Sequence, residues 1–144
     1  MRVWKLPDLS LLQYLHTDKG IIYSCCFSPD GNLIACSTVE GSIIVWDLAS
    51  SKEIIQFKHH SKACFSVAWS QMKVECLLST SSDCTAVVFV LPKSTVEELT
   101  AISKMSSNRS AEVSLRPVTA TYTHPAPIFG GSWSIFSADG NKPY

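Results

Sequence analysis

Two sets of side chains in this 144-residue sequence could do chemistry together, because each contains an imidazole, a hydroxyl and a carboxylate. The sets are His16, Thr38 and Glu40, and His60, Ser81 and Asp83. A hydroxyl nucleophile, an imidazole base and an orienting carboxylate are the groups that serine hydrolases use. The same groups can also form a buried hydrogen-bond network that has no catalytic role. The choice between a catalytic and a structural interpretation depends on the elements that carry them.

The six cysteines are the second group with possible chemistry. They are Cys25, Cys26, Cys36, Cys64, Cys76 and Cys84. They contain no Cys-x-x-Cys pair, which is the spacing typical of zinc ligands. Cys25 and Cys26 are adjacent, so in a strand they point to opposite faces and cannot both reach one partner. We therefore expect six free thiols that pack as small apolar side chains in a reducing compartment, with no metal and no cofactor.

Composition and charge exclude several classes of function. The 12 basic and 12 acidic residues give a formal net charge of zero, so the chain has no bulk attraction for nucleic acid or anionic lipid. The longest apolar run, 86–91, has the length of a strand and is too short to span a bilayer. Lys5, Pro7 and Asp8 interrupt the first residues, which lack the apolar core of a signal peptide. We expect an intracellular, cytoplasmic protein, with the nucleus left open, that binds neither nucleic acid nor membrane.

Short strands separated by tight turns must position these groups. The segment 24–48 alternates strand, turn and strand, with a Ser-Pro-Asp-Gly turn at 28–31 and Trp46-Asp47 at the end of its last strand. The pattern predicts strands at 21–27, 33–38, 42–47 and 54–58, and again at 66–70, 75–80, 85–91 and 118–123. Trp4 lies 42 residues before Trp46, and Phe89 lies 43 residues after it. A fixed period of this length indicates a repeat architecture.

This period, together with the Trp-Asp dipeptide, resembles the WD-repeat β-propeller family. The resemblance implies an all-β fold of antiparallel four-stranded propeller blades, incomplete as in a fragment of a larger propeller, with one short helical insert. Residues 1–16 would end a first blade, 17–58 would form a second, and 59–123 a third with an insert at 92–117. Residues 124–144 would start a truncated fourth blade, with a first strand at 127–136.

The resemblance also implies a structural role for the two sets of polar residues. Blades of this family share a hydrogen-bonded tetrad of a loop histidine, a strand hydroxyl, a turn carboxylate and a tryptophan. In the second blade the matching residues are His16, Thr38, Glu40 and Trp46. In the third blade they are His60, Ser81, Asp83 and Phe89. Because phenylalanine has no N–H group to donate, the tetrad of the third blade is degenerate.

The function implied by the resemblance is that of a non-enzymatic scaffold, which mediates protein–protein interaction within a multiprotein assembly. Its partners would be other proteins or peptide segments, and the remaining blades of a full propeller would be needed for closure. The alternative is a positioning or regulatory propeller portion of a larger chain whose catalytic domain is absent from this sequence. Unpaired strand edges at both ends of the stack would favour self-association of the isolated chain.

Overall fold

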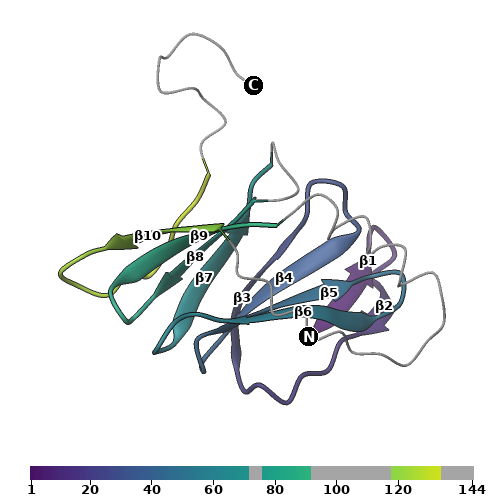
Figure 1. Cartoon of the computed structure of the whole chain (residues 1–144). Coiled ribbons are helices and arrows are strands. Elements are labelled where there is room, and N and C mark those ends of the chain that lie inside the picture. Colours follow the sequence, from purple (N-terminus) through teal and green to yellow (C-terminus); the bar gives the residue numbers. More distant parts are fainter. Residues whose placement is uncertain (72–75, 92–117, 134–144) are drawn as a thin grey trace, which may run out of the picture.

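The structure, a computed structural model, describes residues 1–71, 76–91 and 118–133 (Figure 1). Within these ranges the chain forms ten strands and no helix, so the predicted all-β class is confirmed. The strands form three antiparallel sheets, which lie side by side in Figure 1 from the purple N-terminal strands to the green C-terminal ones. The described residues contain no helix long and apolar enough to span a membrane.

The first sheet has two strands and the other two sheets have four each. The first pairs β1 (Arg2–Lys5) with β2 (Ser10–Tyr14). The second has the order β3 (Ile22–Phe27), β4 (Leu33–Thr38), β5 (Ser42–Asp47) and β6 (Lys52–Lys58). The third follows the same order with β7 (Cys64–Trp69), β8 (Cys76–Ser81), β9 (Thr85–Val90) and β10 (Val118–Thr123). Each four-stranded sheet is thus a meander whose strands pair in sequence order.

The strands end where the sequence supplies turn residues. The carboxylate of Asp30 accepts hydrogen bonds from the Ser28 hydroxyl and, at 3.2 Å, from the backbone N–H of Asn32. Gly31 has a φ of +72°, which most side chains disfavour. Gly41, in the β4–β5 turn, has a φ of +80°, and a Cβ atom there would lie 2.5 Å from the carbonyl oxygens of His60 and Lys62. The glycine therefore lets this turn touch the loop that leads into the third sheet.

Two central strands of the second sheet lie where the sequence predicts them and are buried on both faces. The predicted ranges 33–38 and 42–47 coincide with β4 and β5, whose residues are all buried. The outer strand β6 instead begins at Lys52, two residues earlier than predicted, because Lys52 pairs with Asp47 on β5. Polar residues at a strand end carry no alternation signal, so only the pairing partner defines that boundary.

One predicted strand is absent, and one predicted helix cannot be assessed. Residues 127–133, which the sequence assigns to a first strand of a fourth unit, form no strand, and 134–136 lie outside the described residues. The segment still packs on the third sheet: the Ile128 N–H donates to the Ser81 carbonyl at 3.0 Å, and the Trp133 indole donates to the Ala68 carbonyl at 3.0 Å. A strand needs a hydrogen-bonded neighbour along its length, and these bonds are too few to define one. The helical insert predicted at 92–117 also lies outside the described residues.

The sheets pack face to face through two apolar clusters. The cluster between the second and third sheets comprises Leu33, Ala35, Ile43, Val45, Ile55, Phe57, Cys64, Val67, Trp69, Leu77, Val87, Phe89 and Leu91. The cluster between the first and second sheets comprises Val3, Leu15, Ile34, Cys36, Ile44 and Trp46. The second sheet is therefore covered on both faces, which explains why every residue of β4 and β5 is buried.

Candidate functional site

His60 is the centre of a hydrogen-bond network in the third sheet. It lies in the loop between β6 and β7, and its Nε2 atom is 2.7 Å from the hydroxyl oxygen of Ser79 on β8. Its Nδ1 atom is 3.1 Å from Asp83 Oδ2, in the β8–β9 turn, and 3.0 Å from Thr85 Oγ1, at the start of β9. Asp83 also accepts the backbone N–H of Ser61 at 2.9 Å. The loop, one strand and one turn are therefore joined through a single imidazole.

The charge balance of this network fixes its proton arrangement. Burial lowers the pKa of His60 below 6.5, against the opposing effect of Asp83, so the ring is neutral at pH 7. Burial alone would raise the pKa of Asp83, but hydrogen bonds from Thr85 and Ser61 and the nearby His60 outweigh it and lower that pKa to about 2. The Asp83 carboxylate is then the acceptor for Nδ1–H, and Nε2 accepts the hydroxyl proton of Ser79.

This arrangement has the three groups of a hydrolytic triad but not the access that one requires. Ser79 is 0% exposed and His60 is 2% exposed, so a substrate carbonyl cannot approach the hydroxyl. The network therefore stabilises the sheet. The sequence prediction named Ser81 as the hydroxyl, whereas the Ser81 side chain donates to the Ala63 carbonyl at 2.9 Å. Phe89, as predicted from its lack of an N–H group, is not a hydrogen-bonding member; its ring packs against Phe57 at a centroid distance of 5.1 Å.

The structure does not bring the four matching residues of the second sheet together. Among the described residues, no hydrogen bond joins His16, Thr38, Glu40 or Trp46 to another of the four. His16 is exposed and stacks on Tyr14 at 6.3 Å. Glu40 is exposed as well. The Thr38 hydroxyl instead donates to the Ser42 carbonyl and accepts the Ser42 N–H, both at 3.1 Å, which closes the β4–β5 turn.

Trp46 is left with a buried indole N–H that has no hydrogen-bond partner. The strand registers explain why. Trp46 pairs with Ile34 on β4, and the next position on the same face of β4 is Cys36. In the third sheet Phe89 pairs with Leu77, and the corresponding position is Ser79. A thiol thus occupies the place that holds the histidine-bonded hydroxyl in the neighbouring sheet.

A second feature, which the sequence prediction missed, is a row of three aromatic rings, two on the first strands of the second and third sheets and one in the segment after β10. Tyr23 and Phe65 each sit where the register of the inner strand pair shifts, so each is a bulge residue of its sheet. Their ring centroids are 5.4 Å apart in an edge-to-face arrangement. Phe65 also stacks on Phe129 at 5.0 Å with an interplanar angle of 25°. We call Tyr23, Phe65 and Phe129 the aromatic row.

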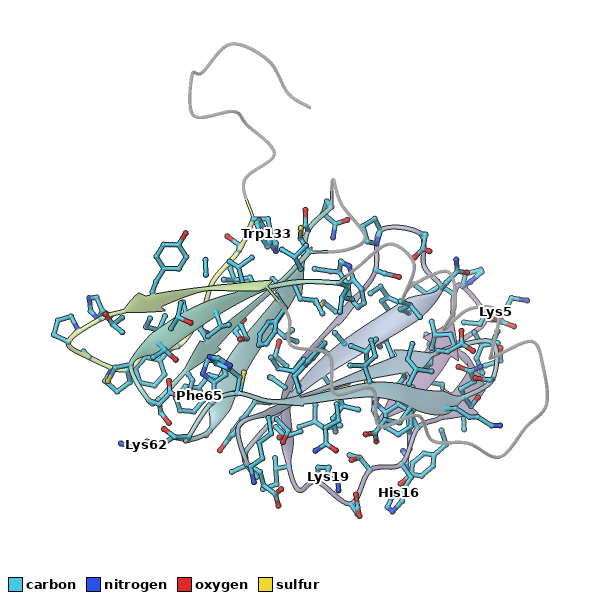
Figure 2. All side chains as sticks on the ribbon, in the orientation of Figure 1. Lys5, His16, Lys19, Lys62, Phe65 and Trp133 are labelled. Carbon is cyan, nitrogen blue, oxygen red and sulfur yellow. The ribbon has the colours of Figure 1, made fainter. Side chains whose placement is uncertain are left out.

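The aromatic row is accessible from solvent at both of its ends. Tyr23 is 49% exposed and Phe129 is 70% exposed, while Phe65 between them is half-buried. Figure 2 shows Phe65 near Lys62, at the end of the third sheet opposite Trp133. The sequence contains a spacing that could have revealed this row. Phe65 follows Tyr23 by 42 residues, the period of the repeat, and Phe65 and Phe129 each follow a histidine by five residues. The three rings contact one another in series, and exposed aromatic side chains of this kind are enriched in protein interfaces.

The described part of the chain shows neither a metal centre nor a disulfide. Among the described residues, no group of three or more His, Cys, Asp or Glu side chains is arranged to hold a metal ion. All six cysteines carry free thiols. The chemistry available to the described part of the chain is therefore that of binding surfaces, buried hydrogen bonds and thiols.

The family model for the WD domain, G-beta repeat, matches residues 10–47. This range begins at β2 and ends with β5, so one sequence repeat includes the outer strand of one sheet and three strands of the next. Residues 10–47 therefore form a WD repeat, and the fold of the chain is that of WD-repeat β-propeller blades. Its three sheets correspond to propeller blades, and the set of blades described is not closed into a ring.

Solved structures with this fold include the β-propeller domain of Cps50 (Swd1) from Myceliophteria thermophila. That match has a TM-score of 0.57 and 19% identity, and it covers 81% of this chain and 30% of the other. Another is a chain in the polycomb repressive complex 2 of Chaetomium thermophilum, with a TM-score of 0.54, 22% identity, and coverage of 60% and 19%. At these identities the likeness shows the fold alone.

Curated relatives match over shorter segments. A component of chromatin assembly factor 1 from Mus musculus is 29% identical over 51 residues, which is 35% of this chain and 9% of that protein. The E3 ubiquitin-protein ligase COP1 of Arabidopsis thaliana is 34% identical over 58 residues, 40% of this chain and 9% of that protein. Coronin-7 of Rattus norvegicus is 32% identical over 80 residues, 49% of this chain and 8% of that protein. The chain thus matches about a tenth of the length of these relatives.

Proposed function

We propose that this protein is a non-enzymatic WD-repeat scaffold that binds a protein segment at the aromatic row, within a multiprotein assembly. The exposed aromatic row is the observation that carries the proposal. Aromatic side chains at a partly exposed surface contribute most of the binding energy in many protein interfaces, because they bury a large area with few rotatable bonds. A formal net charge of zero is consistent with a protein partner.

Two further observations support a scaffold over an enzyme. The one imidazole–hydroxyl–carboxylate arrangement in the described residues is closed to substrate by burial of Ser79 and His60. Relatives and structural neighbours are named as parts of assemblies, such as chromatin assembly factor 1 and polycomb repressive complex 2. The aromatic row would give a subunit of such an assembly a defined contact surface.

Quantitative affinity purification tests this proposal. The tagged protein would be isolated from cells that express it, and co-purifying proteins would be compared between the wild type, Phe129→Ala and Tyr23→Ala. We expect recovery of at least one partner to fall about 10-fold or more, since an aromatic hot spot contributes about 2 kcal/mol. Tyr122→Ala is the matched control, because Tyr122 is 62% exposed on the outer strand β10. Equal recovery by the wild type and all three variants would refute binding at the aromatic row.

A further inference from the structure

Cys25 and Cys36 face each other across the two inner strands of the second sheet. Cys25 lies on β3 and is exposed, Cys36 lies on β4 and is buried, and the two are paired in register. Residues opposite one another in antiparallel strands project from the same face of the sheet. Of the register pairs described, this is the one in which both members are cysteines.

The hydrogen-bond alternation shows how close the two side chains lie. Ser28 continues β3 and donates its N–H to the carbonyl of Leu33, directly opposite, at 2.9 Å, so this is a hydrogen-bonded pair. Antiparallel pairs alternate between hydrogen-bonded and non-hydrogen-bonded types. Since Ser28–Leu33 is hydrogen-bonded, the next pair, Phe27–Ile34, is not, and the pair after it, Cys26–Ala35, is again hydrogen-bonded. Cys25–Cys36 is therefore a non-hydrogen-bonded pair. In such pairs the Cα atoms are about 4.5 Å apart and the side chains approach most closely, within the roughly 4.4–6.8 Å that a disulfide spans.

The surroundings of the two thiols give them different roles. The Cys36 thiol points toward the first sheet, where it donates to the Met1 sulfur at 3.6 Å. Burial, with a smaller contribution from Cys25, raises the pKa of Cys36 to about 12. Cys25 is the thiol that solvent reaches, so it meets an oxidant first. Cys26 projects to the other face, pairs with Ala35 and packs against the cluster between the second and third sheets.

We propose that Cys25 and Cys36 are a redox pair that forms a reversible cross-strand disulfide. With a low-molecular-weight disulfide such as oxidised glutathione, Cys25 sulfur attacks one sulfur of the oxidant. One glutathione thiol leaves and takes the Cys25 proton. Cys36 then attacks the Cys25 sulfur, and the second glutathione leaves with the Cys36 proton. Two protein thiols are oxidised to one disulfide, and one glutathione disulfide is reduced to two thiols.

The proposal is tested on the full chain in buffers of graded reduced and oxidised glutathione, quenched with acid and analysed by mass spectrometry. Tryptic cleavage after Lys19 and Lys52 leaves Cys25, Cys26 and Cys36 in one peptide. We expect this peptide to lose the mass of two hydrogens on oxidation and to regain it with reductant. Cys26→Ser is the matched control and should behave as the wild type, whereas Cys25→Ser should lose the effect.

Variant Cys36→Ala gives a second, positive signature. Without the resolving thiol, Cys25 should accumulate as a mixed disulfide, and the protein should gain the mass of one glutathione. Because Cys25 is exposed, Cys25→Ser reports on the reaction even if Cys36→Ala folds poorly. A stable glutathione adduct on the wild type, or loss of the two-hydrogen shift in Cys26→Ser, would overturn the proposed pair.

Discussion

The second and third sheets have the same strand order and the same bulge in the first strand, yet each contains only part of the histidine–hydroxyl–carboxylate–tryptophan pattern. The third sheet has the His60, Ser79 and Asp83 chain but a phenylalanine in the tryptophan place. The second sheet has Trp46, but its indole N–H finds no acceptor. Both sheets nevertheless form, because apolar clusters cover them. The comparison indicates that face-to-face apolar packing determines the blade, while the network adds local stability.

The largest expected effect comes from removing the imidazole of the third sheet. His60→Ala should lower the free energy of unfolding by about 2–3 kcal/mol, because the Ser79 hydroxyl and the Asp83 carboxylate lose a buried partner. His16→Ala, at the matching place before the second sheet, should change it by less than about 0.5 kcal/mol, because that side chain is exposed. Urea unfolding followed by tryptophan fluorescence measures both. Equal losses would mean that the two sheets do not differ in this network.

The next effect concerns the turn that joins the second sheet to the loop before β7. Gly41→Ala should cost about 2 kcal/mol or more, because the new methyl group would meet two backbone carbonyl oxygens in addition to the strain of a positive φ. Gly31→Ala shares the positive φ but has no atom within 4 Å, so it should cost only about 1 kcal/mol. Thermal melts of the two variants measure both losses of stability. The difference between them gives the cost of the steric contact at Gly41, because the backbone strain is common to both. A smaller cost for Gly41→Ala than for Gly31→Ala would contradict this assignment.

A smaller effect is expected at the tryptophan of the second sheet. Trp46→Phe should change the free energy of unfolding by no more than about 1 kcal/mol, because the loss of ring volume is offset by removal of an unpartnered buried N–H. Urea midpoints would check this value. A loss above about 2 kcal/mol would show that the indole N–H donates to a buried acceptor, and that the second sheet also contains a hydrogen-bonded network.

The smallest effect is the response to acid. The pKa of His60 in the folded chain lies below 6.5, so as the pH falls through 6.5 the imidazole is protonated more readily in the unfolded chain than in the folded one. This difference lowers the stability of the folded chain as the pH falls. The folded pKa of Asp83 is about 2, so its stabilisation is complete above its unfolded pKa of about 4 and is lost as the pH falls from there toward 2. Wild-type stability should therefore decrease from pH 7 to pH 5 more steeply than that of His60→Gln. Parallel curves for the two proteins would exclude His60 as the cause.

Several features of the fold could be predicted from the sequence. Strands 33–38, 42–47 and 118–123 were placed to the residue, because alternation, β-branched residues and turn residues agreed there. Pairing of His60 with Asp83 also followed from the family pattern. The strand predicted at the start of the fourth unit does not form over 127–133. An apolar pattern can favour a strand, but the strand forms only where a neighbouring strand pairs with it.

The sequence by itself determined the repeat, the turns and which residue types fill equivalent places, because strand alternation and turn chemistry are local properties. Only the tertiary structure decided which hydroxyl reaches His60. Ser79 and Ser81 are two residues apart and share a face of β8, so no alternation pattern can distinguish them. The bulges at Tyr23 and Phe65 likewise shift the register of the first strand pair in each sheet, so that Ile22 lies opposite Thr38 and Cys64 lies opposite Ser81. A one-residue shift in register moves every side chain to the opposite face, and only contacts between strands distant in sequence fix it.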